Sequence, residues 1–442
     1  MIRLALAAAM SLALVSTPTA SRAASVERVT TPLGLEIWFV RDDTLPMLSV
    51  EYAFRGGAAQ DPTARPGVAN LVAGLLDEGA GPLDARAFQE RLEARAITVH
   101  FSADRDTLRG SIRTLSEHRA EAFELARLAL TAPRFDAEAV ERVRAAMLAG
   151  LRRRATNPND IASQRWSALA FPGHPYGRPV EGTLDSVPQI SADDLRAFAS
   201  DNFARSNLKI AAVGSIDAKE LAILVDKLFG GLPEKAKLAA VPDVTPQAGV
   251  REVVDLNVPQ TVILFGGAGL KRADPDFIPA YVLNHILGGG TFTSRLYREV
   301  REKRGLAYSI SSHLAPYDYA GIFLGSVSTR NDRAQQSLDI ITEEIRRIAA
   351  EGPTSEELAK AKSFLIGSYA LRFDTSGKIA GQLLSLQLEN LDISYLDQRK
   401  ALIEGITDAD IRRAAKRFLA DARLLVLMVG RPVGVISGVN GG

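Results

Sequence analysis

The side chains that most often carry out hydrolytic or metal-dependent chemistry are scarce in this chain. It has no cysteine, and its five histidines are His100, His118, His174, His285 and His313. A helical zinc site needs two histidines one turn apart, as in His-X-X-Glu-His or His-Glu-X-X-His, whereas the closest two here are eighteen residues apart. No Ser-His-Asp arrangement stands out by local motif. The sequence therefore predicts neither a metal site nor a bound cofactor in this chain.

Two other features with a possible chemical role are better explained as structure. His174 lies in the Pro- and Gly-rich segment Phe171 to Thr183, which is typical of a turn, and His285 lies in an expected helix from Ile278 to Leu287. The glycines Gly288 to Gly290 follow that helix without a preceding strand or a Gly-Lys-Ser/Thr ending, so they do not indicate a phosphate loop. They predict the end of a helix, with a backbone that a substrate can approach closely.

The first 23 residues have the composition of a signal peptide. One basic residue, Arg3, precedes an apolar run from Leu4 to Val15, and Ser21-Arg22-Ala23 offers a cleavage site. The run is about 12 residues long, short of the ~20 that cross a bilayer, and without cysteine there is no lipid attachment site. We expect residues 1–23 to be removed and the mature chain to be free in the periplasm of a Gram-negative cell, with a retained anchor as the alternative.

The charge of the chain argues against a nucleic-acid partner. Fifty-three basic and fifty-two acidic residues give a formal net charge of +1. The densest basic cluster, within residues 142–154, has helical spacing and predicts a solvated helix face. No other apolar stretch is long enough to span a membrane, so no span is expected after signal cleavage.

The chain contains an internal repeat. The segment Ile190 to Gly214 aligns without a gap with Ile406 to Gly430 at an offset of 216, and each copy has the pattern of a capped helix followed by an apolar strand. Residues 137–151 match 355–369 at an offset of 218. We therefore expect two homologous domains, residues 24–235 and 250–442, joined by a linker over residues 236–249.

Strand-like and helix-like segments within each half are grouped rather than alternating. Neighbouring strands are expected over residues 97–103 and 107–112, and again over 307–313 and 321–327. Helical periods cover residues 117–130, 137–153 and 333–349. This order predicts an α+β fold in which each domain is an antiparallel sheet packed with helices.

Three segments resemble the pitrilysin, insulinase and mitochondrial processing peptidase family of inverted-motif zinc peptidases. They are Phe171-Pro-Gly-His-Pro-Tyr-Gly-Arg-Pro-Val-Glu-Gly-Thr183, the long string from Gly288 to Ser309, and Gly67-Val-Ala-Asn-Leu-Val-Ala-Gly74. With the repeat, the resemblance extends over essentially the whole mature chain. It implies two α+β domains that enclose a cavity for an extended peptide.

The resemblance places the family's zinc motif on residues that cannot bind zinc. Asn70 and Gly74 align with the two histidines of His-X-X-Glu-His, and Ala73 aligns with the glutamate that activates water. About 76 residues later the third ligand is expected near Gly150, in Leu148-Ala149-Gly150-Leu151. Because no histidine lies before residue 100, a shift of register does not restore the site.

The second half keeps another feature that the resemblance associates with catalysis, an arginine and a tyrosine seven residues apart. These are Arg301 and Tyr308. In the family such a pair faces the zinc across the cavity, where the tyrosine hydroxyl can donate to the oxyanion and the arginine can hold a substrate carbonyl. The alternative is that Arg301 and Tyr308 have only a structural role. Three neighbouring arginines do not have the family's spacing to Tyr308: Arg295, Arg298 and Arg304.

The loss of the metal ligands together with the retained pair predicts half of a shared site. The expected function is the non-metal subunit of a two-chain periplasmic peptidase, paired with a zinc-bearing homologue and acting on unfolded peptides. Two alternatives stay open at this point. One is a non-catalytic peptide-binding or assembly protein of the same fold, and the other is a peptidase that is active alone through another mechanism.

Overall fold

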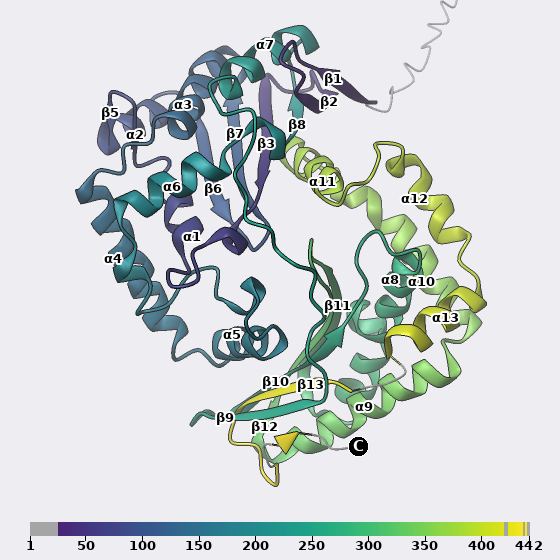
Figure 1. The fold of residues 1–442 in the computed structure, drawn as a ribbon. Helices are drawn as coiled ribbons and strands as arrows, with labels where there is room; N and C mark the ends of the chain where they lie inside the picture. Colours follow the sequence, from purple (N-terminus) through teal and green to yellow (C-terminus); the bar gives the residue numbers. More distant parts are fainter. Residues whose placement is uncertain (1–24, 420–422, 436–437, 440–442) are drawn as a thin grey trace, which may run out of the picture.

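The computed structural model describes residues 25–419, 423–435 and 438–439, which form two halves of similar architecture (Figure 1). We refer to residues 25–235 as the N-terminal half and to the residues from 250 onward as the C-terminal half. The predicted signal peptide lies outside the described residues. Among the helices that the model describes, none has both the length and the apolar character needed to cross a membrane.

The N-terminal half is built on a six-stranded sheet with the order β1-β2-β8-β3-β7-β6. Its strands are β1 (Val26–Thr30), β2 (Glu36–Arg41), β3 (Met47–Arg55), β6 (Thr98–Ala103), β7 (Thr107–Leu115) and β8 (Leu208–Gly214). Its α-helices are α1 (Val68–Ala73), α2 (Ala85–Glu93), α3 (Arg119–Thr131), α4 (Ala137–Arg154), α5 (Pro158–Ala170), α6 (Ala192–Asn202) and α7 (Ala218–Phe229). The short strands β4 (Gly79–Ala80) and β5 (Leu83–Asp84) pair with each other. A large apolar core fills the space between this sheet and its helices.

The C-terminal half is built on a second six-stranded sheet, with the order β11-β12-β10-β13-β9-β14. Its strands are β9 (Val250–Asp255), β10 (Gln260–Ala268), β11 (Ala307–Pro316), β12 (Gly321–Arg330), β13 (Leu425–Gly430) and β14 (Gly438–Val439). Its α-helices are α8 (Phe277–Asn284), α9 (Ala334–Glu351), α10 (Ser355–Gly367), α11 (Ser376–Leu388), α12 (Tyr395–Glu404) and α13 (Asp408–Leu419). Two π-helical turns, η6 (His285–Gly289) and η8 (Tyr297–Glu302), flank the 3-10 turn η7 (Thr291–Thr293).

The two sheets have equivalent strand orders, which confirms the predicted α+β fold with two homologous domains. The repeat also preserves local chemistry. Ser191 and Asp194 form a capping box at the start of α6, and the aligned Thr407 and Asp410 exchange the same hydrogen bonds at the start of α13. One detail differs from the expected antiparallel sheets, because β2 pairs with β8, and β9 with β13, in parallel. Long helical segments separate the strands of each pair, so the chain is free to return in either direction.

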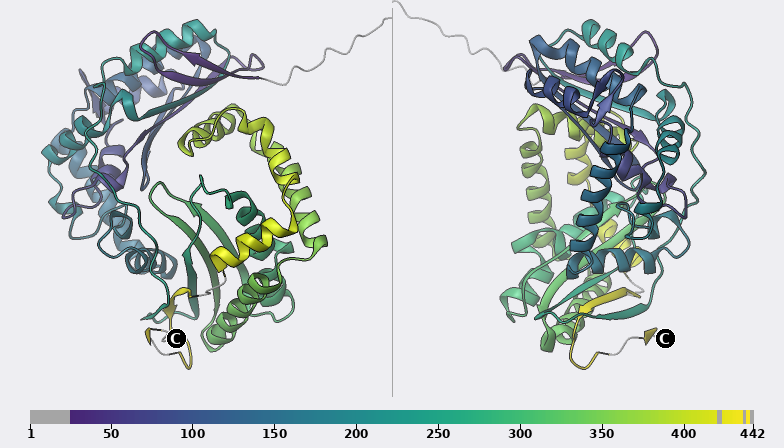
Figure 2. Two further views of the ribbon diagram at one scale, coloured as in Figure 1. Left: turned by 45° about the vertical axis from the view of Figure 1, so that its right-hand side comes forward. Right: turned by 90° about the vertical axis from the view of Figure 1, so that its left-hand side faces the viewer.

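Each half lends one helix to the sheet of the other half. Helix α5 packs on β10 and β13, where Trp166 joins an apolar cluster with Leu264 and Leu427. Helix α11 packs on β3 and β8, where Leu383 joins a cluster with Trp38. Figure 2 shows the C-terminal helices arching toward the N-terminal sheet. The exchange buries apolar surface between the halves and fixes how they face each other.

The segment 236–249 contains no helix or strand and is bound to both halves. On the N-terminal half, the amide N–H of Ala239 donates to the Gln60 side chain at 2.7 Å. His174 contacts the carbonyl oxygen of Pro242 through Nε2 at 3.0 Å, while its Nδ1 accepts from the backbone of Tyr176. On the C-terminal half, the amide N–H of Val244 donates to the carbonyl oxygen of Tyr319 at 2.9 Å. His174 therefore holds a turn and the adjoining segment together.

Candidate functional site

The residues at the zinc-motif positions lie on and after the short helix α1. Asn70 is half-buried, Ala73 is buried with 3% exposure, and Gly74 is the exposed residue at which the helix ends. A side chain at Gly74 would have little room, because its Cβ would lie 3.2 Å from Cγ1 of Val143 on α4. A methyl group, an amide and a residue without a side chain supply none of the ligands that zinc prefers.

Gly150 lies on α4, seven residues after the valine that faces Gly74. A Cβ at Gly150 would meet only the guanidinium of Arg153, at 3.8 Å. The next residue, Leu151, lines the cavity between the two halves and packs against the N-terminal core. Across residues 25–419, 423–435 and 438–439, no group of three or more His, Cys, Asp or Glu side chains could hold a metal ion. The residues present therefore do not fit a zinc ion.

A buried carboxylate organises the start of α1. Asp61 accepts hydrogen bonds from the backbone N–H groups of Gly67, at 2.7 Å, and of Ala69, at 2.8 Å. Burial raises the pKa of Asp61 to about 7, against the opposing effect of these hydrogen bonds and of the nearby Arg178. Gly67 itself has a φ of 104°, a conformation that favours glycine. The helix keeps a complete N-terminal framework although its zinc-binding residues are missing.

The retained pair lies at the start of β11, the outer strand of the second sheet. Arg301 is in the π-helical turn η8, and its guanidinium lies between two aromatic rings, 4.8 Å from the centroid of Tyr297 and 5.2 Å from that of Tyr308. Tyr308 is 84% exposed. It sits in a β-bulge, where the pairing with β12 shifts register between Ala307 and Ile310. Bulges and π-helical turns commonly redirect side chains at functional sites.

The four arginines of this segment differ in their partners. Arg295 is buried and forms a bidentate ion pair with Glu357, which Arg298 also approaches at 3.5 Å. Arg304 pairs with the buried Glu299 at 2.7 Å. Arg301 has no carboxylate within ion-pair distance among the described residues. Its guanidinium is therefore held by the two tyrosine rings alone and has hydrogen-bond donors free.

The ion pair between Arg295 and Glu357 connects the segment 295–304 to α10. Glu357 accepts both hydrogen bonds of Arg295, at 2.9 and 2.6 Å, and one from the backbone of Thr354. These hydrogen bonds and the adjacent cation outweigh burial and lower the pKa of Glu357 to about 2. The pair anchors the helical turn that carries Arg301 to α10.

The three glycines lie at the end of the helix, as expected, and they also pack closely against the protein's own chain. A Cβ at Gly288 would come within 2.9 Å of the backbone nitrogen of Ser312, and one at Gly290 within 2.8 Å of the carbonyl oxygen of His285. These glycines therefore allow close packing of the protein's own backbone against β11. The expected helix also ends as a π-helical turn, because α8 gives way to η6 at His285.

Exposed aromatic side chains beside the pair were not identified from the sequence. Phe292 is 67% exposed and meets Tyr297 edge to face, with 5.2 Å between ring centroids. Phe364 on α10 is 59% exposed and stacks on His285 at 5.0 Å. Their spacing in the sequence gives no helical or strand period that would have marked them. In the fold, Phe292 is linked to Arg301 through the ring of Tyr297, which both side chains contact.

The structure keeps the two sets of predicted residues apart. Asn70, Ala73, Gly74 and Gly150 belong to helices of the N-terminal half, and Arg301 and Tyr308 belong to the C-terminal half. No hydrogen bond, ion pair or ring contact joins the sets within the described part of the chain. The fold is that of the two-domain inverted-motif peptidase class, and the residues at the predicted zinc-motif positions are not metal ligands.

Comparisons with known proteins identify the family. Residues 40–184 match the model of "Insulinase (Peptidase family M16)", and residues 189–365 match that of "Peptidase M16 inactive domain". The chain therefore belongs to the M16 peptidase family, as the sequence motifs predicted.

Individual relatives agree with this assignment. The "Uncharacterized zinc protease SCO5738" of Streptomyces coelicolor is 28% identical over 89% of this chain and 87% of its own length. The "Non-peptidase homolog YmxG" of Helicobacter pylori is 27% identical over 75% of this chain and 77% of its own length. A crystal structure described as a peptidase M16 inactive domain, from Pseudomonas fluorescens, is 29% identical with a TM-score of 0.87, over 94% of this chain and all of that one. These matches support a non-catalytic M16-like subunit.

Proposed function

We propose that this chain is the non-metal subunit of a periplasmic two-chain zinc peptidase that cleaves unfolded peptides. In this proposal a homologous subunit carries the zinc and its activated water. Arg301 and Tyr308 of this chain complete that site from the opposite wall. The N-terminal half guides the peptide and contributes to assembly.

The observation that carries the proposal is the state of Arg301 and Tyr308. The guanidinium of Arg301 has no carboxylate partner in the described chain, and the ring of Tyr308 is almost fully exposed. An exposed aromatic ring beside a cation without a carboxylate partner offers a surface that another molecule can cover and pair with. At the same time Asn70, Ala73 and Gly74 give this chain no means of activating water.

The chemistry of the pair suits a transition state rather than a nucleophile. The Tyr308 hydroxyl can donate a hydrogen bond to the oxyanion that forms as a peptide carbonyl is attacked. The free N–H groups of Arg301 can hold a neighbouring carbonyl oxygen of the peptide. Because the two side chains contact each other, they can act on adjacent groups of one substrate.

Edge strands offer a way to bind an extended peptide. Strands β6 and β11 are each the outer strand of their sheet, so one row of backbone N–H and carbonyl groups is left for another strand. Strand addition would give affinity through main-chain hydrogen bonds with little demand on sequence. This supports an unfolded peptide as the substrate.

Reconstitution tests the proposal. The chain from residue 24 onward is purified alone and together with an M16 homologue from the same cell that carries His-X-X-Glu-His. We expect the chain alone to hold no stoichiometric zinc and to leave an unstructured fluorogenic peptide intact. We expect the mixture to form a complex and to cleave the peptide in a chelator-sensitive way.

Two results would contradict the proposal. One tightly held zinc per isolated chain, with chelator-sensitive hydrolysis, would show that the chain is a peptidase by itself. A complex whose partner cleaves equally well with and without this chain would favour the assembly protein instead.

A further inference from the structure

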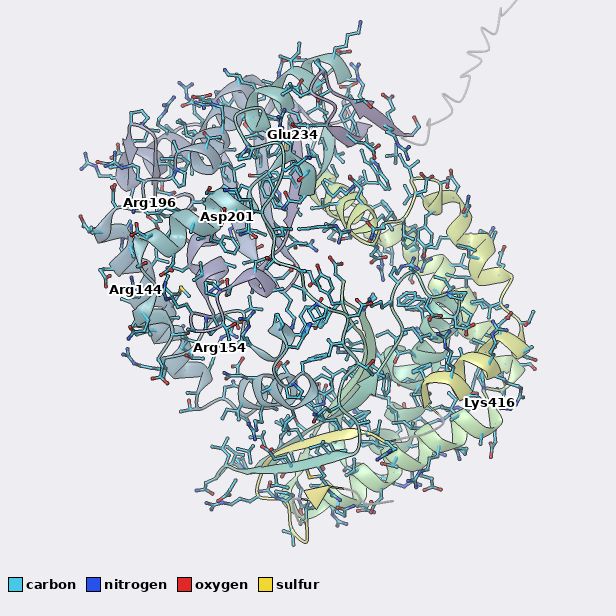
Figure 3. All side chains as sticks on the ribbon, viewed as in Figure 1. Arg144, Arg154, Arg196, Asp201, Glu234 and Lys416 are labelled. Atoms are coloured by element: carbon cyan, nitrogen blue, oxygen red, sulfur yellow. The ribbon has the colours of Figure 1, made fainter. Side chains whose placement is uncertain are left out.

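The largest cavity described lies between the two halves and is separate from Arg301 and Tyr308. Its volume is about 1040 Å³, which is at the upper end of the size of ligand-binding pockets. The wall combines the β6–β7 and β11–β12 turns with the ends of α4 and α11 and one face of α5. Figure 3 shows side chains from both halves in this region, with Arg154 labelled at the end of α4.

The cavity wall carries six basic and six acidic side chains, but the basic ones are not equally compensated. Four of them, Arg109, Arg154, Lys271 and Arg272, each have a carboxylate at 2.5 to 3.4 Å. Within the described residues, Arg105 and Arg178 have none within ion-pair distance. The Nε–H groups of both are buried and also lack an acceptor there.

Hydrogen bonds hold the side chains of Arg105 and Arg178 in fixed positions on the wall of this cavity. Nη2 of Arg105 donates to Oγ of Ser167 at 2.9 Å, and its guanidinium lies 5.7 Å from the ring centroid of Tyr317. Nη2 of Arg178 donates to the carbonyl oxygen of Ala59 at 3.3 Å, and the amide of that same residue donates to the carbonyl oxygen of Arg105 at 2.8 Å. The backbone of Ala59 therefore links the main chain at Arg105 to the guanidinium of Arg178, and both side chains line the same cavity.

Partial burial of the Arg105 and Arg178 guanidinium groups is unfavourable when no carboxylate contacts them. Both are less than about one-third exposed, and burial lowers the pKa of Arg178 below its usual value. Asp61 lies near Arg178 but beyond ion-pair distance, so neither guanidinium has a carboxylate in direct contact among the described residues, and a bound anion would offset the cost of its partial burial. The planar fork of guanidinium groups matches a carboxylate in particular.

The rest of the wall suits the body of a peptide. The ring of Tyr317 and the side chains of Leu151, Leu184 and Leu388 supply apolar surface next to the arginines. Asp160 and Glu181 share a single basic partner, Arg154, and Asp106 has no ion-pair partner among the described residues, so negative charge is left over for a cationic group of a ligand. Apolar surface and unpaired carboxylates beside the two arginines favour a peptide that ends in a carboxylate over an inorganic anion.

We propose that this cavity binds the free C-terminal carboxylate of a short peptide, with Arg105 and Arg178 as the carboxylate-binding residues. The site would belong to this chain alone and does not depend on a zinc partner. It would therefore retain peptides by their C-terminal ends at a distance from the Arg301 and Tyr308 pair.

Equilibrium dialysis of the complete mature chain tests this proposal. The probe is a pool of N-acetylated tetrapeptides of mixed sequence, supplied once as free acids and once as C-terminal amides, with mass spectrometry of the retained fraction. We expect free acids to be retained at least tenfold more strongly than amides, and inorganic phosphate at tenfold lower concentration not to displace them. Equal retention of acids and amides, no retention of either, or displacement by that phosphate would overturn the proposal.

Variants locate the site. Arg105→Gln and Arg178→Gln should each lower the retention of free acids about tenfold, with unchanged circular dichroism. Lys271→Gln is the matched control, because this lysine lines the same cavity but already pairs with Asp243. If Lys271→Gln lowers retention as much as the arginine variants, the cavity senses only overall charge and the assignment fails. The comparison of acids with amides on the unmodified chain decides the matter even if a variant does not fold.

Discussion

The two halves of this chain have equivalent sheets but very different functional surfaces. In the N-terminal half, α1 has its backbone framework intact while Asn70, Ala73 and Gly74 provide no metal ligand. In the C-terminal half, Arg301 and Tyr308 stand exposed on a bulged outer strand. Loss of the metal ligands has left the fold undisturbed, because the capping carboxylate and the sheet contacts do not depend on them. The fold of the N-terminal half therefore does not require metal-binding side chains.

The carboxylates that support the two surfaces differ in the same way. Asp61 beneath α1 has burial as its main influence, and its pKa is raised to about 7. Glu357 beneath η8 is paired with Arg295, and its pKa is lowered to about 2. Deprotonation of Asp61 thus destabilises the folded state, whereas deprotonation of Glu357 stabilises it.

The largest effect on stability is expected where the halves exchange helices. Trp166→Ala should lower the free energy of unfolding by about 3 to 5 kcal/mol, and Leu383→Ala by about 2 to 5 kcal/mol, because both side chains fill clusters shared between the halves. Urea denaturation followed by circular dichroism measures both. Arg165→Ala, which removes only an exposed ion pair with Glu252, is the control and should cost less than about 1 kcal/mol. Small losses in both core variants would mean that the halves are stable separately.

The next largest effect concerns turnover of the proposed complex. Tyr308→Phe should lower kcat by ~10²- to 10³-fold, since it removes one oxyanion donor, and Arg301→Ala should also raise KM. Steady-state kinetics after gel filtration of each complex provides the measurement. Arg298→Ala is the matched control three residues away, because Arg295 still pairs with Glu357. Normal rates in the Tyr308 and Arg301 variants would make both residues structural.

A smaller loss of stability should follow from restoring one residue of the zinc motif. Ala73→Glu places a carboxylate at a position with 3% exposure and should cost about 2 to 3 kcal/mol. The same change at the exposed Ala145 of α4 should cost less than about 0.5 kcal/mol. Both values come from urea denaturation, with zinc analysis of the Ala73→Glu protein expected to remain negative. An unchanged stability would mean that α1 still has room for the catalytic glutamate.

A further effect is a dependence of stability on pH. The folded pKa of Asp61, about 7, lies above its unfolded value of 3.8, so the native state holds a proton that the unfolded state has lost. Stability should therefore fall as the pH rises from about 4 to about 7, and Asp106, with a pKa raised to about 6, acts in the same direction. Between pH 5 and pH 8 we therefore expect a decrease in stability, to which Asp61 contributes more than Asp106.

Asp61→Asn isolates this contribution. The amide oxygen can still accept a hydrogen bond from the start of α1, but the group no longer titrates. Urea midpoints at pH 5 and pH 8 should differ less in this variant than in the unmodified protein. Glu357 does not interfere, because its contribution is lost only as the pH falls from about 4.5 toward 2. An identical slope in both proteins would assign the pH dependence elsewhere.

Much of the fold could be predicted from the sequence because its signals are local. In the repeat, the expected capped helix and apolar strand appear as α6 and β8 in the N-terminal half and as α13 and β13 in the C-terminal half. The expected pairs of strands appear as β6 with β7 and β11 with β12. The roles of Asn70, Ala73, Gly74, Gly150, Arg301 and Tyr308 remain predictions until they are tested.

What the sequence did not indicate depends on contacts between distant residues. The spacing to Tyr308 singles out Arg301 in the sequence, but it does not show that Arg304 has Glu299 as a partner in the fold while Arg301 has no carboxylate partner among the described residues. The exchange of α5 and α11 was equally hidden, because an apolar helix face does not specify which sheet it covers. The uncompensated arginines of the central cavity come from segments more than seventy residues apart.

The exchange of α5 and α11 has a mechanical consequence. Each sheet is covered by a helix that belongs to the other half. A hinge motion between the halves would therefore expose buried apolar surface on both sheets at the same time. The two halves should therefore move together as one rigid body. If a peptide chamber forms with a second subunit, it must open at the boundary between the two subunits, and the affinity of that boundary would then set how fast substrates enter and products leave.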